Sequence, residues 1–188
     1  MAIILFLFAF LIPKEESNFE AYFTGQTFRL DYYHSGTAKE EHISMDEVRL
    51  EGAWPGSKVH LIDGTNMGKY LFEVVDLGSN KVIYSRGFSS IYGEWETTGE
   101  AGKIWRTFHE SQRFPEPKNK FQLVIKKRQD DGSFSQIYTT TADPKSRFIN
   151  RSPIVPSGNV WTVFENGTPN SKVDLLIMAD GYAASDKD

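Results

Sequence analysis

The histidines are the first residues to examine for chemistry, because the sequence has four of them and no cysteine. One of them, His109, opens the string HESQR, which shares its first two letters with the HExxH zinc motif of metallopeptidases. In that motif, two histidines four residues apart lie on one helix face and bind the metal. Arg113 occupies the place of the second histidine here, and a guanidinium that stays protonated cannot bind zinc. We therefore interpret His109 as a surface or loop residue.

Other catalytic and metal-binding patterns are also incomplete. The string EEH, residues 40–42, offers carboxylate and imidazole groups, but such clusters are common on solvated loops. The string QDDGS, residues 129–133, resembles the start of a calcium loop without its distal glutamate and is typical of a hairpin turn. The sequence contains no G-x-S-x-G nucleophile elbow. Because it has no cysteine, thiolate chemistry and disulfides are excluded. We predict no catalytic residue, no metal ligand and no cofactor in this chain.

The segment YSRGFSSIYGEWETTGEA, residues 84–101, combines charged, aromatic and glycine residues more densely than the rest of the chain. Its candidate cluster consists of Arg86, Tyr92, Glu94, Trp95 and Glu96. In one interpretation, Arg86 forms a desolvated bidentate ion pair with Glu94 or Glu96, covered by the two aromatic side chains. In the other, the segment binds an extended ligand on its aromatic faces. Glycines flanking a tryptophan are typical of tight backbone packing, which favours the structural interpretation.

Alternating apolar residues predict β-structure over most of the chain. In TFRLDYY, for example, Phe28, Leu30 and Tyr32 share one face, and in KFQLVIKK Phe121, Leu123 and Ile125 do so. The predicted strands are 27–33, 48–50, 59–62, 69–76, 81–84, 120–127 and 135–141. Turn signals such as Gly78-Ser79-Asn80 and Asp131-Gly132 separate them, which favours an all-β fold, an antiparallel β-sandwich. Residues 89–101 interrupt the pattern, and we expect a long structured loop there.

The composition of the chain limits the classes of protein to which it can belong. Hydrophobic residues make up 39% of 188, enough for a sizeable core. The net charge is −4 and the basic residues are scattered, so we exclude a nucleic-acid partner. The apolar run from Ala2 to Ile12 is shorter than the ~20 residues of a transmembrane span. It suits the core of a secretory signal, although no basic residue precedes it; a buried first strand is the alternative. We expect an export segment in residues 1–18 and a protein that is secreted or at the cell surface.

The C-terminal part has a different pattern. Residues 143–159, DPKSRFINRSPIVPSGN, hold three of the eight prolines and no periodicity, which is typical of a linker. The string VWTVFENG then predicts one strand. The apolar run in VDLLIMADGY predicts a strand buried on both faces, as in a parallel α/β sheet. We therefore expect a β-sandwich over residues 19–142, a linker over 143–159 and the first strand of a truncated α/β domain over 160–188.

Several of these strings resemble the N-terminal domain of the bacterial immunoglobulin A peptidase family of zinc metallopeptidases. They are TFRLDYYHSG, LIDGTNMGKYLFEVVD, YSRGFSSIYGEWETTGEA, RFPEPKNKFQLVIKKR and KVDLLIMADGYAASDKD. The resemblance runs from about Thr27 to the end, and its most specific part is the segment from Arg86 to Trp95. It implies a β-sandwich followed by an α/β catalytic domain that opens with a strand and a Gly-Tyr turn, here Val173 to Ala179 and Gly181-Tyr182. The zinc ligands of that family lie further along, so no catalytic or metal residue is carried over.

The resemblance implies a non-catalytic N-terminal accessory domain that supports or targets a catalytic domain missing from this chain. The chain itself would be inactive and its parent protein zinc-dependent. Its partners would be its own C-terminal catalytic domain and a host glycoprotein. The residues leave an alternative open: a stand-alone β-sandwich that binds glycans or proteins, suggested by the aromatic content and the acidic charge. A third hypothesis, a peptidase within this chain, is disfavoured because HExxH is absent.

Overall fold

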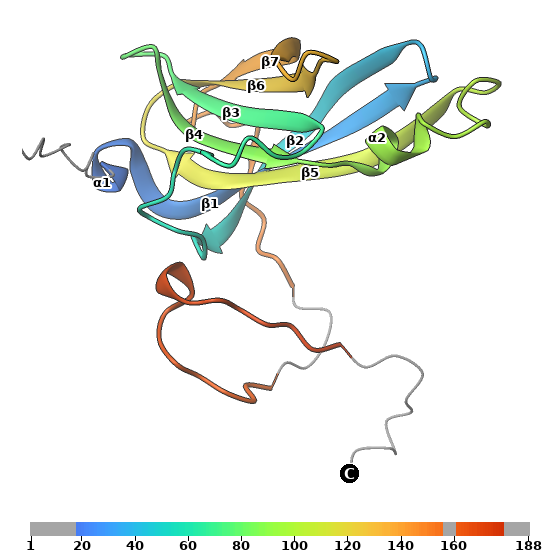
Figure 1. Ribbon diagram of the computed structural model, residues 1–188. Coiled ribbons are helices and arrows are strands. Elements are labelled where there is room, and N and C mark those ends of the chain that lie inside the picture. Colours follow the sequence, from blue (N-terminus) through green and yellow to red (C-terminus); the bar gives the residue numbers. More distant parts are fainter. Residues whose placement is uncertain (1–17, 156–160, 179–188) are drawn as a thin grey trace, which may run out of the picture.

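Two four-stranded sheets pack face to face in the computed structural model, which describes residues 18–155 and 161–178 (Figure 1). Sheet A has the order β5 (Arg106–Pro117), β1 (Phe23–Gly36), β2 (Glu41–Ala53) and β8 (Ile149–Asn150). Sheet B has the order β4 (Lys81–Phe88), β3 (Tyr70–Asp76), β6 (Phe121–Arg128) and β7 (Phe134–Ala142). Neighbouring strands are antiparallel except β2 and β8. The predicted antiparallel β-sandwich is therefore confirmed.

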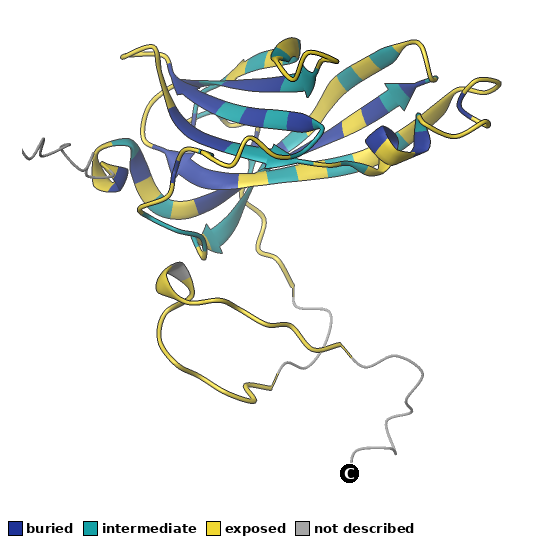
Figure 2. Ribbon diagram, in the orientation of Figure 1, coloured by how far each residue is buried: buried dark blue, intermediate teal, exposed yellow. Residues whose placement is uncertain are grey.

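The alternation read from the sequence places the core. The inward residues of β1, β3 and β6 are almost completely buried, whereas their neighbours point to the other side of each sheet. Figure 2 shows this as buried residues that alternate with less buried ones along the strands. Phe114 of β5 lies at the centre, with its ring centroid 6.0 Å from that of Phe28 and 5.5 Å from that of Phe72. The contact between Phe114 and Phe72 joins sheet A to sheet B.

Strand β5 was not predicted, and its sequence explains why. Its inward positions are Phe108, Glu110, Gln112 and Phe114, so two polar residues interrupt the apolar alternation. The strand pairs with β1 along nearly its whole length, including the pair formed by Tyr33 and His109. A pattern search based on apolar periodicity alone therefore misses this strand.

Two other local predictions are wrong. No strand forms at residues 59–62: Val59 and Ile62 are exposed, and only Leu61 reaches the core, where its carbonyl accepts a hydrogen bond from the Ser85 backbone. The expected loop over residues 89–101 begins with a short helix, α2 (Ile91–Trp95). The Ser90 hydroxyl accepts a hydrogen bond from the backbone N–H of Gly93, which satisfies one of the free donors at the helix start. A second short helix, α1 (Phe19–Tyr22), precedes β1.

The segment predicted to be a linker begins inside the sandwich. Its residues Ile149 and Asn150 form β8, which lies parallel to β2 beside Val48 and Arg49, and Ile149 is 7% exposed. Residues 149 and 150 therefore belong to the sandwich, and a linker over the residues that follow them stays a prediction. Strand β8 has only two residues, which is too short for an alternating apolar pattern to indicate a strand.

The two strands expected in residues 160–167 and 173–179 do not form in the part of the chain that the structure describes. Residues 161–178 contain one 3-10 turn, η1 (Pro169–Ser171), and no strand. Leu175, Leu176 and Ile177 are 77–86% exposed. A strand buried on both faces needs neighbours for its edges and layers for its faces, and this segment has neither here. Its assignment to an α/β domain stays a prediction.

The expected export segment, with its apolar run from Ala2 to Ile12, lies outside the described residues apart from residue 18. No helix among the residues that the structure describes is long and apolar enough to cross a membrane.

Candidate functional site

The most connected polar group in the sandwich is centred on His34, near the end of β1. Its imidazole is 1% exposed. Its Nε2 lies 2.8 Å from Glu41 Oε1 on β2, and its Nδ1 lies 3.0 Å from Glu110 Oε2 on β5. The ring of Tyr92 from α2 stacks on it with the centroids 4.0 Å apart and an interplanar angle of 18°. Three strands of sheet A and the α2 helix therefore meet at one buried side chain.

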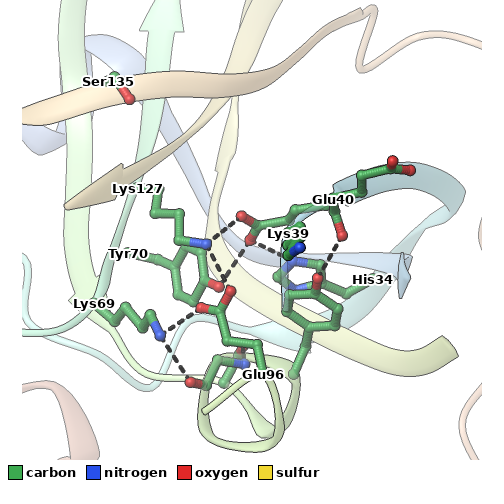
Figure 3. A network of polar contacts seen from close by, with 12 residues as sticks. His34, Lys39, Glu40, Lys69, Tyr70, Glu96, Lys127 and Ser135 are labelled. Atoms are coloured by element: carbon green, nitrogen blue, oxygen red, sulfur yellow. Dashed lines mark hydrogen bonds and ion pairs between the residues drawn. The ribbon is translucent and has the colours of Figure 1, made fainter. Parts of the chain in front are cut away.

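The same group extends into sheet B (Figure 3). The Tyr70 hydroxyl on β3 donates a hydrogen bond to Glu41 Oε1 at 2.8 Å. Lys127 Nζ on β6 lies 2.5 Å from Glu41 Oε2 and 2.9 Å from Glu96 Oε2. Lys69 forms an ion pair with Glu96 and donates to the carbonyl of Gly93. We call this group the His34 cluster; it consists of His34, Glu41, Lys69, Tyr70, Tyr92, Glu96, Glu110 and Lys127.

The cluster also fixes α2 and the turn between β1 and β2. The backbone N–H of Tyr92 donates to Glu110 Oε1 at 3.1 Å, and its hydroxyl lies 2.8 Å from the carbonyl oxygen of Thr37. Gly93 packs against the Tyr70 ring so closely that an added Cβ would lie 2.8 Å from a ring carbon. Trp95 is 8% exposed, and its Nε1–H donates to Glu100 Oε2 at 2.8 Å. The glycine beside the tryptophan therefore allows tight packing, as the structural interpretation of the sequence requires.

The charges of the cluster balance when His34 is protonated. Its three carboxylates, Glu41, Glu96 and Glu110, face two lysines and the imidazolium. Burial alone would lower the pKa of His34, but the hydrogen bonds to Glu110 and Glu41 outweigh burial and raise it. Burial would raise the pKa of Glu41, but hydrogen bonds from His34, Lys127 and Tyr70 lower it to about 2. The pKa of Glu110 is lowered in the same way. The folded state therefore favours the charged forms of the His34 imidazole and of these two carboxylates.

The geometry gives the cluster a structural role. Both nitrogens of His34 are engaged and its side chain is buried, so a substrate or a metal cannot reach it. Within the residues that the structure describes, no three His, Cys, Asp or Glu side chains are grouped so as to hold a metal ion. The cluster instead joins the ends of both sheets and α2, and the loss of any one partner would leave a buried charge uncompensated.

Comparison with known proteins identifies the sandwich. A model of the family Peptidase M64 N-terminus matches residues 18–139. The chain belongs to this family. The match runs from α1 through most of β7 and includes the whole His34 cluster. It confirms a metallopeptidase-related N-terminal domain. No curated protein matches the chain.

In this M64 N-terminal domain, only three of the five residues of the predicted cluster lie together. Tyr92, Trp95 and Glu96 lie together, and the first and last of them belong to the His34 cluster. Glu94 is exposed on α2. Arg86 lies elsewhere: its guanidinium donates to the carbonyls of Ser85 and His60 and lies 5.0 Å from the centroid of the Tyr84 ring.

The predicted ion pair between Arg86 and Glu94 or Glu96 is therefore wrong. Strand β4 continues to Phe88 and holds Arg86 in the sheet, whereas α2 begins only at Ile91. Glu96 takes its cations from β6 and from the residue before β3 instead. Sequence proximity suggested an arginine partner, but the two partners are lysines distant in the sequence, Lys69 before β3 and Lys127 on β6.

Other members of the His34 cluster were missed. His34 continues the inward alternation of Phe28, Leu30 and Tyr32 by two residues, so its burial could have been read from the pattern. Glu41 and Lys127 carried no such signal, because their contacts depend on how the two sheets meet. His109 lies on the surface as predicted and pairs with Asp46 at 3.1 Å.

Proposed function

We propose that this chain is the accessory domain of a secreted zinc metallopeptidase similar to the bacterial immunoglobulin A peptidases, and that it supports and orients a C-terminal catalytic domain. The observation that carries the proposal is the match of residues 18–139 to the N-terminus of a peptidase family. The zinc ligands and the catalytic groups would belong to the catalytic domain. A host glycoprotein such as immunoglobulin A would be the substrate, and the apolar run from Ala2 to Ile12 supports export.

The segment after β7 supports the orienting role, because the sandwich holds it on two sides. Asn150 Nδ2 donates to Glu47 Oε2 at 2.8 Å, next to the parallel pairing of β8 with β2. Arg151 donates to the carbonyl of Pro144, and its Nη1 lies 3.8 Å from Glu116 Oε1. A segment fixed in this way gives a defined direction to whatever follows it. These contacts would fix the point at which the chain leaves the sandwich toward the catalytic domain.

The experiment compares this chain with the full-length protein that contains it, using immunoglobulin A as substrate. We expect no hydrolysis by the chain alone and chelator-sensitive cleavage by the full-length protein. Replacing both Asn150 and Arg151 by alanine in the full-length protein should lower kcat/KM several-fold without changing its zinc content. Arg147→Ala is the matched control, because Arg147 contacts only the exposed Phe148 ring in the described contacts.

Three results would contradict the proposal. Hydrolysis by the chain alone would place a catalytic site within it. Cleavage by the full-length protein that resists chelators would exclude a zinc peptidase. Equal kcat/KM for the double variant and the Arg147→Ala control would remove the orienting role while leaving the peptidase assignment intact.

A further inference from the structure

The outer surface of sheet A behind the His34 cluster carries a distinct set of side chains. Neighbouring residues of a strand point to opposite faces. The strands that turn His34, Glu41 and Glu110 inward therefore turn Tyr33, His42 and His109 outward. The buried cluster thus holds in place, from behind, an exposed surface on the three strands β1, β2 and β5.

Aromatic and histidine side chains form pairs on this surface. The rings of Tyr33 and His109 lie 5.1 Å apart, and those of His42 and Trp105 stack with centroids 5.7 Å apart at 23°. His109 also lies 3.1 Å from Asp46. Tyr33 is 43% exposed and Trp105 is 49% exposed. We call this set, Tyr33, His42, Asp46, Trp105 and His109, the aromatic patch.

A hollow of about 210 Å³ adjoins the patch at His109. It lies between the free edge of β5 and the segment that leads into α2. Its polar lining comes from Ser89, Ser90, Ser111 and Gln112, with Tyr32 and Glu110 on the buried side. The Tyr32 hydroxyl is buried beside the side chains of Glu110 and Gln112. Because β5 is an edge strand, its backbone also offers groups that no neighbouring strand pairs.

We propose that the aromatic patch and the adjoining hollow bind a neutral carbohydrate. A sugar unit has apolar C–H faces and a polar rim of hydroxyls. The rings of Tyr33 and Trp105 offer faces for the C–H groups. The carboxylate of Asp46, together with the serine hydroxyls and the Gln112 amide that line the hollow, offers hydrogen bonds for the sugar hydroxyls. The hollow is smaller than the ~300–1,000 Å³ typical of sites for drug-sized ligands, which suits a single sugar unit.

Charge and size favour this ligand over other partners. The one carboxylate of the patch, Asp46, is paired with His109, so the surface does not select a strongly charged ligand. A stable protein interface buries about 800 Å² on each partner around an apolar centre. Here Asp46 and Ser111 place polar groups on the same outer face of sheet A as the rings, and Ser89 and Ser90 line the hollow that adjoins the patch at His109. Because the His34 cluster fixes the strands behind it, the surface loses little freedom on binding.

The test uses this chain alone and is therefore independent of the proposed peptidase function. The labelled chain is applied to an array of neutral oligosaccharides that end in glucose, galactose, mannose or N-acetylhexosamine. The strongest ligand is then titrated by calorimetry. Tyr33→Ala and Trp105→Ala should each weaken its affinity about tenfold, the order expected for the loss of one aromatic stack. His42→Ala, which removes the ring beneath Trp105, should weaken binding less.

Trp161→Ala is the matched control, because Trp161 is 69% exposed and lies outside the sandwich strands. The affinity of this variant for the oligosaccharide should equal that of the unsubstituted chain. Circular dichroism melting checks that all variants fold. Three results would overturn the proposal: no array oligosaccharide is bound, the affinity is unchanged in both Tyr33→Ala and Trp105→Ala, or the chain binds a glycoprotein equally well after enzymatic removal of its glycans. The last result would assign the surface to a polypeptide.

Discussion

Strand β6 and the segment from Val173 to Met178 have similar apolar sequences and opposite environments. Leu123 of β6 is completely buried, whereas Leu176 is 77% exposed. The difference lies in their neighbours: β6 pairs with β3 on one side and β7 on the other, and sheet A covers its inner face. Residues 173–178 form no strand with any described residue. An apolar pattern therefore indicates that a segment can form a buried strand. Whether the strand forms depends on the neighbouring strands that pair with it and cover it.

The largest expected effect is a direct test of this contrast. Phe72→Ala should lower the free energy of unfolding by about 3–5 kcal/mol, because it empties a fully buried aromatic site between the sheets. Leu176→Ala should change it by less than about 0.5 kcal/mol, because its side chain gives up little burial. Urea unfolding followed by tryptophan fluorescence measures both. A cost above about 1 kcal/mol for Leu176→Ala would show that the C-terminal segment belongs to the core.

The second prediction compares two glutamates of the sandwich. Glu41→Gln should cost about 3 kcal/mol, because it leaves the charges of His34 and Lys127 without one of their anions in a buried setting. Glu94→Gln, on the exposed side of α2, should stay within about 0.5 kcal/mol. The same unfolding experiment applies. Equal stabilities of the two variants would mean that the His34 cluster contributes no more than a surface ion pair.

The third prediction is a stability maximum between about pH 4.5 and 6.5, which follows from the same cluster. The pKa of Glu41 is about 2 in the folded chain and 4.5 ordinarily, so its stabilisation is present above pH 4.5 and is lost as the pH falls towards 2. By pH 3 this loss should reach about 1–2 kcal/mol. The raised pKa of His34 acts in the opposite sense: its stabilisation is complete below 6.5 and is lost as the pH rises through the folded pKa.

Unfolding curves at several pH values measure both limbs. His34→Gln serves as the control, since it should remove the alkaline decline and lower the maximum. A wild-type stability that keeps rising from pH 6.5 to pH 9 would contradict a protonated His34 in the folded chain.

The sequence predicted those parts of the fold that depend on local alternation. Phe28, Leu30 and Tyr32 reach the core as expected, and so do Phe121, Leu123 and Ile125. Strand β5 escaped prediction because Glu110 and Gln112 replace apolar residues on its inward face. Their burial is stable only because polar groups of other elements meet them, and no local pattern records that.

The candidate site shows the same limit. The glycine and tryptophan pattern predicted tight packing in this segment, and in the structure Gly93 lies against the Tyr70 ring while Tyr92 and Trp95 are buried. The pattern gave no information on the ion pairs, because the partners of Glu96 come from residues 27 and 31 positions away in the sequence, at Lys69 and Lys127. Arg86, which is closer in sequence, is held by β4 next to Tyr84. Charge pairing between distant strands follows from sheet topology, which single-sequence periodicity does not specify.

The smallest expected effect tests where the sandwich ends. A chain that stops after Ser152 should keep its melting temperature within about 1 °C, because the side chains removed with residues 161–178 are largely exposed. It should also aggregate less, since Leu175, Leu176 and Ile177 present a continuous apolar strip to other chains.

A chain that stops after Asp143 is the comparison, and it should melt several degrees lower. That cut removes β8, the buried Ile149 side chain and the hydrogen bond between Asn150 and Glu47. Equal melting temperatures for the two chains would show that β8 adds no stability and that the boundary belongs at Asp143. A lower melting temperature after the cut at Ser152 would instead make the C-terminal segment part of the folded unit, and the contrast between Leu123 and Leu176 would lose its basis.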